Sequence, residues 1–87
     1  MPHYADPEFW RLYRGLPDEV RDLADRSFEL LKANPNHPSL HLKKVKGRHG
    51  LWSARVGRSY RALAVEVEDG MQWFWIGTHA DYDRLIG

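Results

Sequence analysis

The chain has 87 residues, of which 43% are hydrophobic and 29% are charged, and this composition is typical of a small globular domain. The absence of cysteine excludes a disulfide framework, a thiolate zinc site and a cysteine nucleophile. No apolar run approaches the ~20 residues that a membrane helix requires, and the amino terminus lacks the basic and apolar regions of a signal peptide. We therefore interpret residues 1–87 as a single cytoplasmic domain that does not contact membranes.

Two helices are predicted in the first part of the chain. Asp6 followed by Pro7 is typical of a helix N-cap and first turn, and Gly15 ends this first helix. The second helix begins at residues 17–19, where two acidic residues suit the helix dipole, and it ends at Asn34, which precedes a proline. The apolar residues of this second helix have the spacing of one buried stripe: Val20, Leu23, Ala24, Phe28 and Leu31.

Short strands are predicted beyond residue 39, with turn sequences between them. The four strand segments are residues 40–46, 51–56, 60–68 and 71–77. Residues 80–86 are expected to form a short helix, and an opening strand is absent or limited to residues 2–5. The expected fold class is therefore α+β, with two N-terminal helices packed on an antiparallel sheet of three to four strands and a short C-terminal helix.

The last two predicted strands are apolar on both faces, including the pair Phe74 and Ile76 opposite the pair Trp73 and Trp75. Such a sheet requires cover on both sides, and the two helices can cover only one of them. We therefore expect a partner protein or the terminal segment to cover part of the second face.

Charged residues are distributed in three blocks along the chain. Residues 1–32 carry five basic and seven acidic residues, residues 33–61 carry seven basic and no acidic residues, and residues 62–87 carry one basic and five acidic residues. A concentrated basic block favours a polyanionic partner. The alternative is that these cations pair with acidic residues of the flanking blocks.

The turn lengths predict a register that gathers basic residues at one end of the sheet. A three-residue loop at 57–59 places Arg55 opposite Arg61, and a two-residue turn at 69–70 places Arg61 opposite Thr78, next to His79. Two opposed arginines repel each other, and a phosphate bound between them would relieve that repulsion. Alternatively, an acidic residue neutralises the arginines, the candidates being Glu66, Asp81 and Asp83.

Metal-binding patterns in the sequence are weak. His37 and His41 have the spacing of metal ligands on a helix, but Pro38 lies between them and makes that helix improbable. His79, Asp81 and Asp83 could bind a hard cation, although such clusters are mostly solvated surface. We expect no metal and no cofactor.

Two segments of the predicted strands have a distinctive sequence: the run from Trp52 to Ala64 reads WSARVGRSYRALA, and the run from Trp73 to His79 reads WFWIGTH. They resemble the RelE/ParE superfamily of type II toxin–antitoxin toxins. The resemblance extends over roughly residues 16–82. It implies a RelE-like microbial ribonuclease fold, a cognate antitoxin protein as partner, and, in the RelE-like branch, metal-independent cleavage of mRNA on the ribosome.

The resemblance also implies roles for individual residues. Arg61 matches the arginine that contacts the scissile phosphate, Arg55 matches a strand position that is basic in several members, and His79 matches a C-terminal histidine that performs acid–base chemistry in some members. Tyr82 approximates an aromatic residue near the carboxyl end of other members. The residues expected to bind the RNA backbone are Lys43, Lys44, Lys46, Arg48 and Arg58. One departure is that residues 33–61 contain no carboxylate, whereas some members place a catalytic glutamate there.

Three functions remain open at this point. The first is an mRNA endoribonuclease in which His79 accepts the proton of a ribose 2′-hydroxyl and Arg61 stabilises the phosphate. The second is a ParE-like inhibitor of DNA gyrase, which has the same fold and requires no catalytic histidine. The third is an inactive orphan that only binds a partner.

Overall fold

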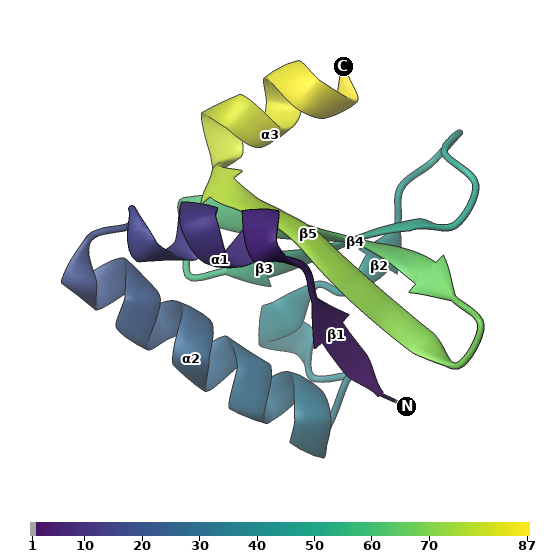
Figure 1. Cartoon of the computed structure of the whole chain (residues 1–87), viewed down its shortest axis with the longest axis horizontal. Coiled ribbons are helices and arrows are strands. Elements are labelled where there is room, and N and C mark those ends of the chain that lie inside the picture. Colours follow the sequence, from purple (N-terminus) through teal and green to yellow (C-terminus); the bar gives the residue numbers. More distant parts are fainter. Residues whose placement is uncertain (1) are drawn as a thin grey trace.

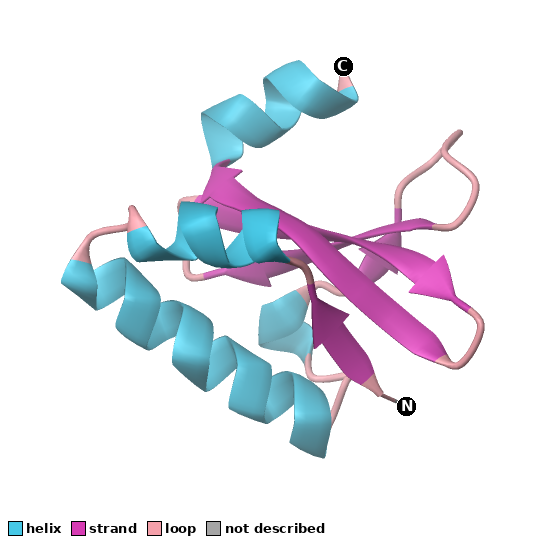
Figure 2. Ribbon diagram, in the orientation of Figure 1, coloured by secondary structure: helices cyan, strands magenta, loops and turns pink. Residues whose placement is uncertain are grey.

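Five strands form one mixed sheet, with helices on both of its sides (Figures 1 and 2). This computed structural model describes residues 2–87, and the strand order in the sheet is β1-β5-β4-β3-β2. The elements in chain order are β1 (His3–Ala5), α1 (Pro7–Arg14), α2 (Asp18–Ala33), the 3₁₀ helix η1 (Pro38–Leu40), β2 (Lys43–Lys44), β3 (Leu51–Val56), β4 (Tyr60–Val67), β5 (Gly70–Thr78) and α3 (His79–Ile86). The predicted α+β fold class is confirmed.

The helix boundaries follow the local signals in the sequence. The side chain of Asp6 accepts a hydrogen bond from the backbone N–H of Phe9 at 3.0 Å, and Pro7 occupies the first turn of α1. Gly15 caps the carboxyl end of α1, and Asn34 caps that of α2. Across residues 2–87, no helix combines the length and apolar character that crossing a lipid bilayer requires.

The opening strand is present as β1, so the sheet has more strands than the expected three to four. β1 pairs in parallel with β5, and the backbone bond from Met71 N to Pro2 O, 3.1 Å, continues this pairing. The indole Nε1 of Trp73 also donates to Nδ1 of His3 at 3.1 Å. Three residues are too few to show the alternation of a strand, and it is these contacts with β5 that stabilise β1.

One face of the sheet, which we call the covered face, packs against α1, α2 and η1. Figure 1 shows α1 crossing the sheet and α2 lying next to α1. Leu31 of α2 and Leu40 of η1 join the core residues of β3, β4 and β5 that point to this face, which are Ala54, Val56, Ala62, Ala64, Met71, Trp73 and Ile76. Of the apolar stripe predicted for the second helix, Leu31 belongs to this core, and Leu23 and Ala24 pack against the core.

A β-bulge in β5 changes the predicted faces of this strand. Leu63 pairs with Trp75 and Ala64 pairs with Trp73, which leaves Phe74 without a partner on β4. Trp73 and Ile76 therefore share the covered face, Trp75 lies on the other face, and the prediction that Trp73 and Trp75 share a face is wrong.

The turn between β4 and β5 also differs from the prediction. Val67 pairs with Gly70, so Glu68 and Asp69 form the turn, and the predicted pairing of Glu68 with Met71 does not form. Met71 instead pairs with Glu66. Relative to the prediction, the turn shifts the pairing of β4 with β5 in one direction, and the bulge shifts it part of the way back. At the end of the strands away from this turn, the pairing therefore differs from the prediction by one residue.

The second face of the sheet, which we call the open face, carries Arg55 and Arg61 together with apolar residues. Leu63 is buried there beside Trp75. A Cβ on Gly77 would lie 2.5 Å from the Trp75 ring, so the indole covers this glycine. In Figure 1, α3 leaves the end of β5 and lies on the opposite side of the sheet from α2. The terminal segment therefore covers part of the second face, as expected.

Candidate functional site

The predicted pairing of Arg55 with Arg61 is confirmed. The connection between β3 and β4 is a three-residue loop in which Gly57 has a φ of 62°, and Val56 pairs with Tyr60 on either side of it. The next pair along the strands is Arg55 with Arg61, and both side chains start from the open face. The sequence of this loop therefore positions two guanidinium groups on adjacent strands.

Arg61 is the central residue of the site. Its guanidinium carbon lies 5.2 Å from the ring centroid of Tyr82 on α3, a cation–π contact. Its Nε and Nη1 atoms are buried and have no hydrogen-bond partner. Buried donors without partners are uncommon and costly in folded proteins. Arg61 therefore carries hydrogen-bond donors that the described residues 2–87 do not use.

His79 lies at the start of α3, beside the same tyrosine. Its ring centroid is 6.0 Å from that of Tyr82, and its backbone N–H donates to Ser59 O at 2.7 Å, which fixes the start of α3 on the β3–β4 loop. Its Nδ1 lies 3.2 Å from Oδ2 of Asp83, one helical turn later. An Nδ1–H donated to this carboxylate leaves Nε2 free to accept a proton.

The pairing of β4 with β5 differs by one residue from the prediction at this site. Arg61 pairs with Gly77 and Tyr60 pairs with Thr78, whereas Thr78 and His79 were expected at these positions. Gly77 has no side chain, and the edge of the Trp75 ring lies over this position opposite Arg61.

Arg55 makes its contacts away from Arg61, Tyr82 and His79. Its Nε donates to Gly57 O at 3.1 Å, and its Nη1 lies 3.4 Å from Nε2 of His41. The predicted site is therefore formed by three of its four residues, and Arg55 lies at the outer edge of β3. His41 was considered in the sequence only as a metal ligand, and its left-handed backbone, with a φ of 44°, brings it to this edge.

The acidic residues that could have neutralised the arginines have other partners. Glu66 accepts a hydrogen bond from Trp52 Nε1 at 2.7 Å, Asp81 pairs with Arg84, and Asp83 contacts His79. Among residues 2–87, no carboxylate lies within 4.0 Å of Arg55 or Arg61. Asp83 is the site residue whose role the sequence did not reveal, although its spacing of four residues from His79 is the available signal.

The basic residues expected to bind RNA are all exposed and free of carboxylates. Lys43 and Lys44 lie on β2, and the Lys44 ammonium is 5.7 Å from the ring centroid of Trp52. Arg48 donates to Ile86 O at 3.2 Å, which links the β2–β3 loop to the end of α3. Among residues 2–87, none of the seven basic residues of 33–61 forms an ion pair, so the alternative in which flanking acids neutralise this block is wrong.

The structure shows no arrangement typical of a metal site in the part of the chain that it describes, residues 2–87. Nδ1 of His37 accepts a hydrogen bond from Ser39 N at 3.2 Å and caps η1. His41 lies beside Arg55. His37 thus caps η1 and His41 contacts Arg55 at the edge of β3, and these two roles account for the spacing of the two histidines.

Comparison with known families gives one match. The family description of the ParE-like toxin domain matches residues 18–84 of the chain, which include the whole of β2 to β5 and most of α3. None of the curated protein sequences compared with the chain matches it.

Several solved structures share the fold at low sequence identity. The RelB–RelE antitoxin–toxin complex from Methanococcus jannaschii aligns with a TM-score of 0.75 and 18% identity, covering 97% of this chain and 99% of that one. YafQ from E. coli strain BL21(DE3) aligns with a TM-score of 0.73 and 13% identity, covering 93% and 96%. The YoeB/ParE toxin from Agrobacterium tumefaciens aligns with a TM-score of 0.68 and 16% identity, covering 91% and 99%.

Proposed function

The chain belongs to the family of ParE-like toxin domains, and from this we propose that it is the toxin of a type II toxin–antitoxin system and that it cleaves mRNA on the ribosome. The observation that carries the ribonuclease assignment is Arg61, whose buried Nε and Nη1 have no partner and whose guanidinium lies against Tyr82. Solved structures that are similar in fold include RelE and YafQ toxins and their antitoxin complexes, which supports a protein antitoxin as partner.

The proposed reaction is a transesterification at the phosphodiester. The Nε2 atom of His79 accepts the proton of the ribose 2′-hydroxyl, and the 2′-oxygen forms a bond to phosphorus while the bond to the 5′-oxygen breaks. The leaving 5′-oxygen takes a proton from solvent, and the products are a 2′,3′-cyclic phosphate and a 5′-hydroxyl. Arg61 stabilises the negative charge that develops on the phosphoryl oxygens.

The neighbouring residues position these two groups. Tyr82 contacts both the Arg61 guanidinium on β4 and the His79 ring on α3, and it thereby keeps these two groups close to each other. Asp83 orients the imidazole through Nδ1. The exposed cations of β2 and its following loop then bind flanking phosphates, as does Arg58.

The test is to induce the protein in a bacterium, with and without the adjacent open reading frame, and to follow RNA integrity. We expect mRNA cleavage that Arg61→Ala or His79→Ala lowers by about 10²-fold or more while the circular dichroism of the folded protein persists. Arg26→Ala removes the same side-chain type as Arg61→Ala from an exposed position on α2 and is expected to leave cleavage unchanged. Cleavage at the wild-type rate by the Arg61→Ala/His79→Ala double variant would disprove the mechanism.

The family description itself favours one second candidate, a ParE-like inhibitor of DNA gyrase. This function requires no acid–base residue, so toxicity would survive both substitutions and would be accompanied by DNA damage with intact mRNA. Harmless overexpression of the folded wild-type protein would instead indicate an inactive binding module. The same induction experiment separates the three outcomes.

A further inference from the structure

Within residues 2–87, the buried polar side-chain atoms that have no hydrogen-bond partner belong to two residues. They are Oγ of Ser53 and the Nε and Nη1 atoms of Arg61. Ser53 is 0% exposed, and it is the one polar residue in the buried set of this part of the chain. A buried hydroxyl without a partner is uncommon and costly, whereas alanine would fill the same position without that cost. Packing alone therefore does not explain a serine at this position.

The strand register makes Ser53 and Arg61 neighbours on the open face. Ser53 pairs with Leu63 and Arg55 pairs with Arg61, so Ser53 is a diagonal neighbour of Arg61 across the pair of β3 and β4. Residues two apart on a strand point to the same face, which places Ser53 on the face of the two arginines. Diagonal neighbours are about 7–8 Å apart, and an arginine side chain is long enough to bring its guanidinium to a serine hydroxyl over that distance.

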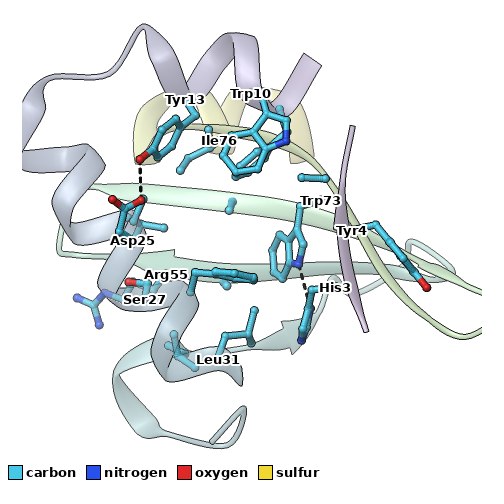
Figure 3. A pocket seen from close by; sticks show the side chains of 18 residues that line it. His3, Tyr4, Trp10, Tyr13, Asp25, Ser27, Leu31, Arg55, Trp73 and Ile76 are labelled. Atoms are coloured by element: carbon cyan, nitrogen blue, oxygen red, sulfur yellow. Dashed lines mark hydrogen bonds between the residues drawn. The ribbon is translucent and has the colours of Figure 1, made fainter. Parts of the chain in front are cut away.

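Arg55, which stands directly opposite Arg61, turns away from it. Its guanidinium nitrogens contact Gly57 and His41, and its side chain reaches a cavity of about 190 Å³ that lies on the covered face between α1, α2 and β1 (Figure 3). Two small residues of the sheet form part of the floor of this cavity, Ala54 and Ala62. The Arg55 guanidinium thus lies outside the space between Ser53 and Arg61.

The other neighbours of Arg61 on the strands of the open face offer no acceptor. Gly77, its partner on β5, has no side chain, and Leu63 is apolar. The indole of Trp75, which lies over Gly77, can only donate a hydrogen bond. Ser53 is therefore the side chain among these neighbours whose oxygen can accept a hydrogen bond from Arg61.

We propose that Ser53 is a positioning residue of the ribonuclease site, whose Oγ accepts a hydrogen bond from Nε or Nη1 of Arg61 when a phosphate binds to Nη2. The inference rests on the proposed function, in which Arg61 stabilises the phosphate. Nη2 does not belong to the buried set and is the nitrogen left for a ligand. Catalytic hydrogen bonds are often long or misaligned in a free enzyme and tighten when the ligand binds. Ser53 then fixes the direction of the guanidinium without touching the RNA.

Two substitutions separate this role from packing. Ser53→Ala removes a hydroxyl that has no partner in the free protein, so its Tm without phosphate should equal or exceed that of the wild type. Ser53→Thr keeps the hydroxyl but adds a methyl group at a fully buried position, so its Tm should fall. We expect the binding of phosphate to follow the hydroxyl and not the stability.

The ligand used in the test is inorganic phosphate, titrated at constant ionic strength with chloride as the compensating salt, and binding is measured from the rise in Tm. Ser53→Ala should bind phosphate about tenfold more weakly than the wild type, the change expected when one hydrogen bond to a charged group is lost, and its cleavage of mRNA should fall by a similar factor. Ser53→Thr should keep the affinity of the wild type. Arg61→Met measures the rise in Tm that comes from phosphate bound elsewhere.

Ser27→Ala is the matched control. Ser27 lies on α2 and lines the cavity of the covered face, on the other side of the sheet from Arg61 (Figure 3). Its substitution removes the same hydroxyl group and should leave both phosphate affinity and cleavage as in the wild type.

Equal phosphate affinity in Ser53→Ala and the wild type would overturn the proposal. A lower Tm of Ser53→Ala without phosphate would also overturn it, because the hydroxyl would then have a structural partner in the free protein. Ser53→Ala decides the question by itself if Ser53→Thr does not fold. Phosphate binding that depends on Ser53 in a protein that cleaves no RNA would refute the proposed function alone, whereas cleavage that depends on Arg61 and not on Ser53 would refute this inference alone.

Discussion

Replacing Arg61 by methionine is expected to stabilise the protein and at the same time to abolish RNA cleavage. The buried Nε and Nη1 atoms have no hydrogen-bond partner, and each such donor costs about 1–3 kcal/mol. Methionine keeps an unbranched apolar chain and has no donor to leave unpaired. The substitution also removes the repulsion from Arg55 on the adjacent strand, and it loses the cation–π contact with Tyr82, which is worth about 0.5–2 kcal/mol.

The two unpaired donors together cost about 4 kcal/mol at mid-range and the cation–π contact is worth about 1 kcal/mol, so we expect a net gain of about 3 kcal/mol in the free energy of unfolding. For a domain of this length, that gain raises Tm by about 12–24 °C. Circular dichroism during thermal unfolding measures the change. Arg58→Met is the matched control, because Arg58 is exposed in the β3–β4 loop and its substitution should change stability by less than about 0.5 kcal/mol.

A lower Tm for Arg61→Met than for the wild type would refute the reasoning, because it would mean that the folded protein already satisfies the guanidinium. Inorganic phosphate supplies an independent measurement. At ten times its dissociation constant, a bound anion stabilises the folded state by about 1.4 kcal/mol. The wild type should therefore gain more Tm from phosphate than Arg61→Met does, and equal gains would refute specific binding at this arginine.

Three further predictions concern RNA affinity, pH and packing. Replacing the lysines of residues 43–46 by glutamine should lower the salt dependence of binding to single-stranded RNA, reducing the slope of log K against log salt by about 2, since each phosphate contact contributes about 0.7. Burial lowers the pKa of His3 below 6.5, so the unfolded chain binds this proton at a higher pH than the folded protein does; stability in urea should therefore fall as the pH drops below 6.5. Gly77→Ala should cost about 1–3 kcal/mol in thermal unfolding, because its Cβ would lie 2.5 Å from the Trp75 ring.

Each of these predictions has a control and an outcome that contradicts it. An unchanged salt slope in the lysine variant would contradict the placement of RNA phosphates beside β2. His3→Gln retains an acceptor for the Trp73 indole but does not titrate, so an unaltered pH profile in this variant would contradict the assignment to His3. Gly15 has a φ of −82° and no neighbouring atom closer than 3.5 Å to an added Cβ, so Gly15→Ala should not destabilise, and equal losses at Gly15 and Gly77 would contradict the packing argument.

Features set by local chemistry were predictable from the sequence. Asp6 caps α1 because its side chain can reach the N–H three residues later, and the pairing of Arg55 with Arg61 follows from the length of one loop. The predicted bounds of β3 are also those of the structure. The resemblance to the RelE/ParE superfamily, which depended on residues of β3, β4 and β5, is confirmed by the family match over residues 18–84.

Features decided by contacts between distant segments were not predictable. The bulge at Phe74 depends on how β5 packs between β1 and β4, and no residue type in the strand marks it. The direction of the Arg55 side chain depends on His41, which reaches the edge of β3 through a left-handed residue conformation that the sequence does not signal. The cavity on the covered face likewise depends on where α1 and α2 lie, although the small residues on its floor are visible in the sequence.

The candidate site combines one rigid group with two that depend on a terminal helix. Arg61 belongs to β4, which pairs with a neighbouring strand on each side, so its backbone is held by two ladders of hydrogen bonds. His79 and Tyr82 belong to α3, whose contacts outside its own turns include the backbone bond to Ser59 and the bond from Arg48 to Ile86. Few contacts permit local opening at low free energy. Arg61, the proposed phosphate-binding group, is thus preformed, and the position of the proposed base depends on the docking of α3 against Arg61 through Tyr82.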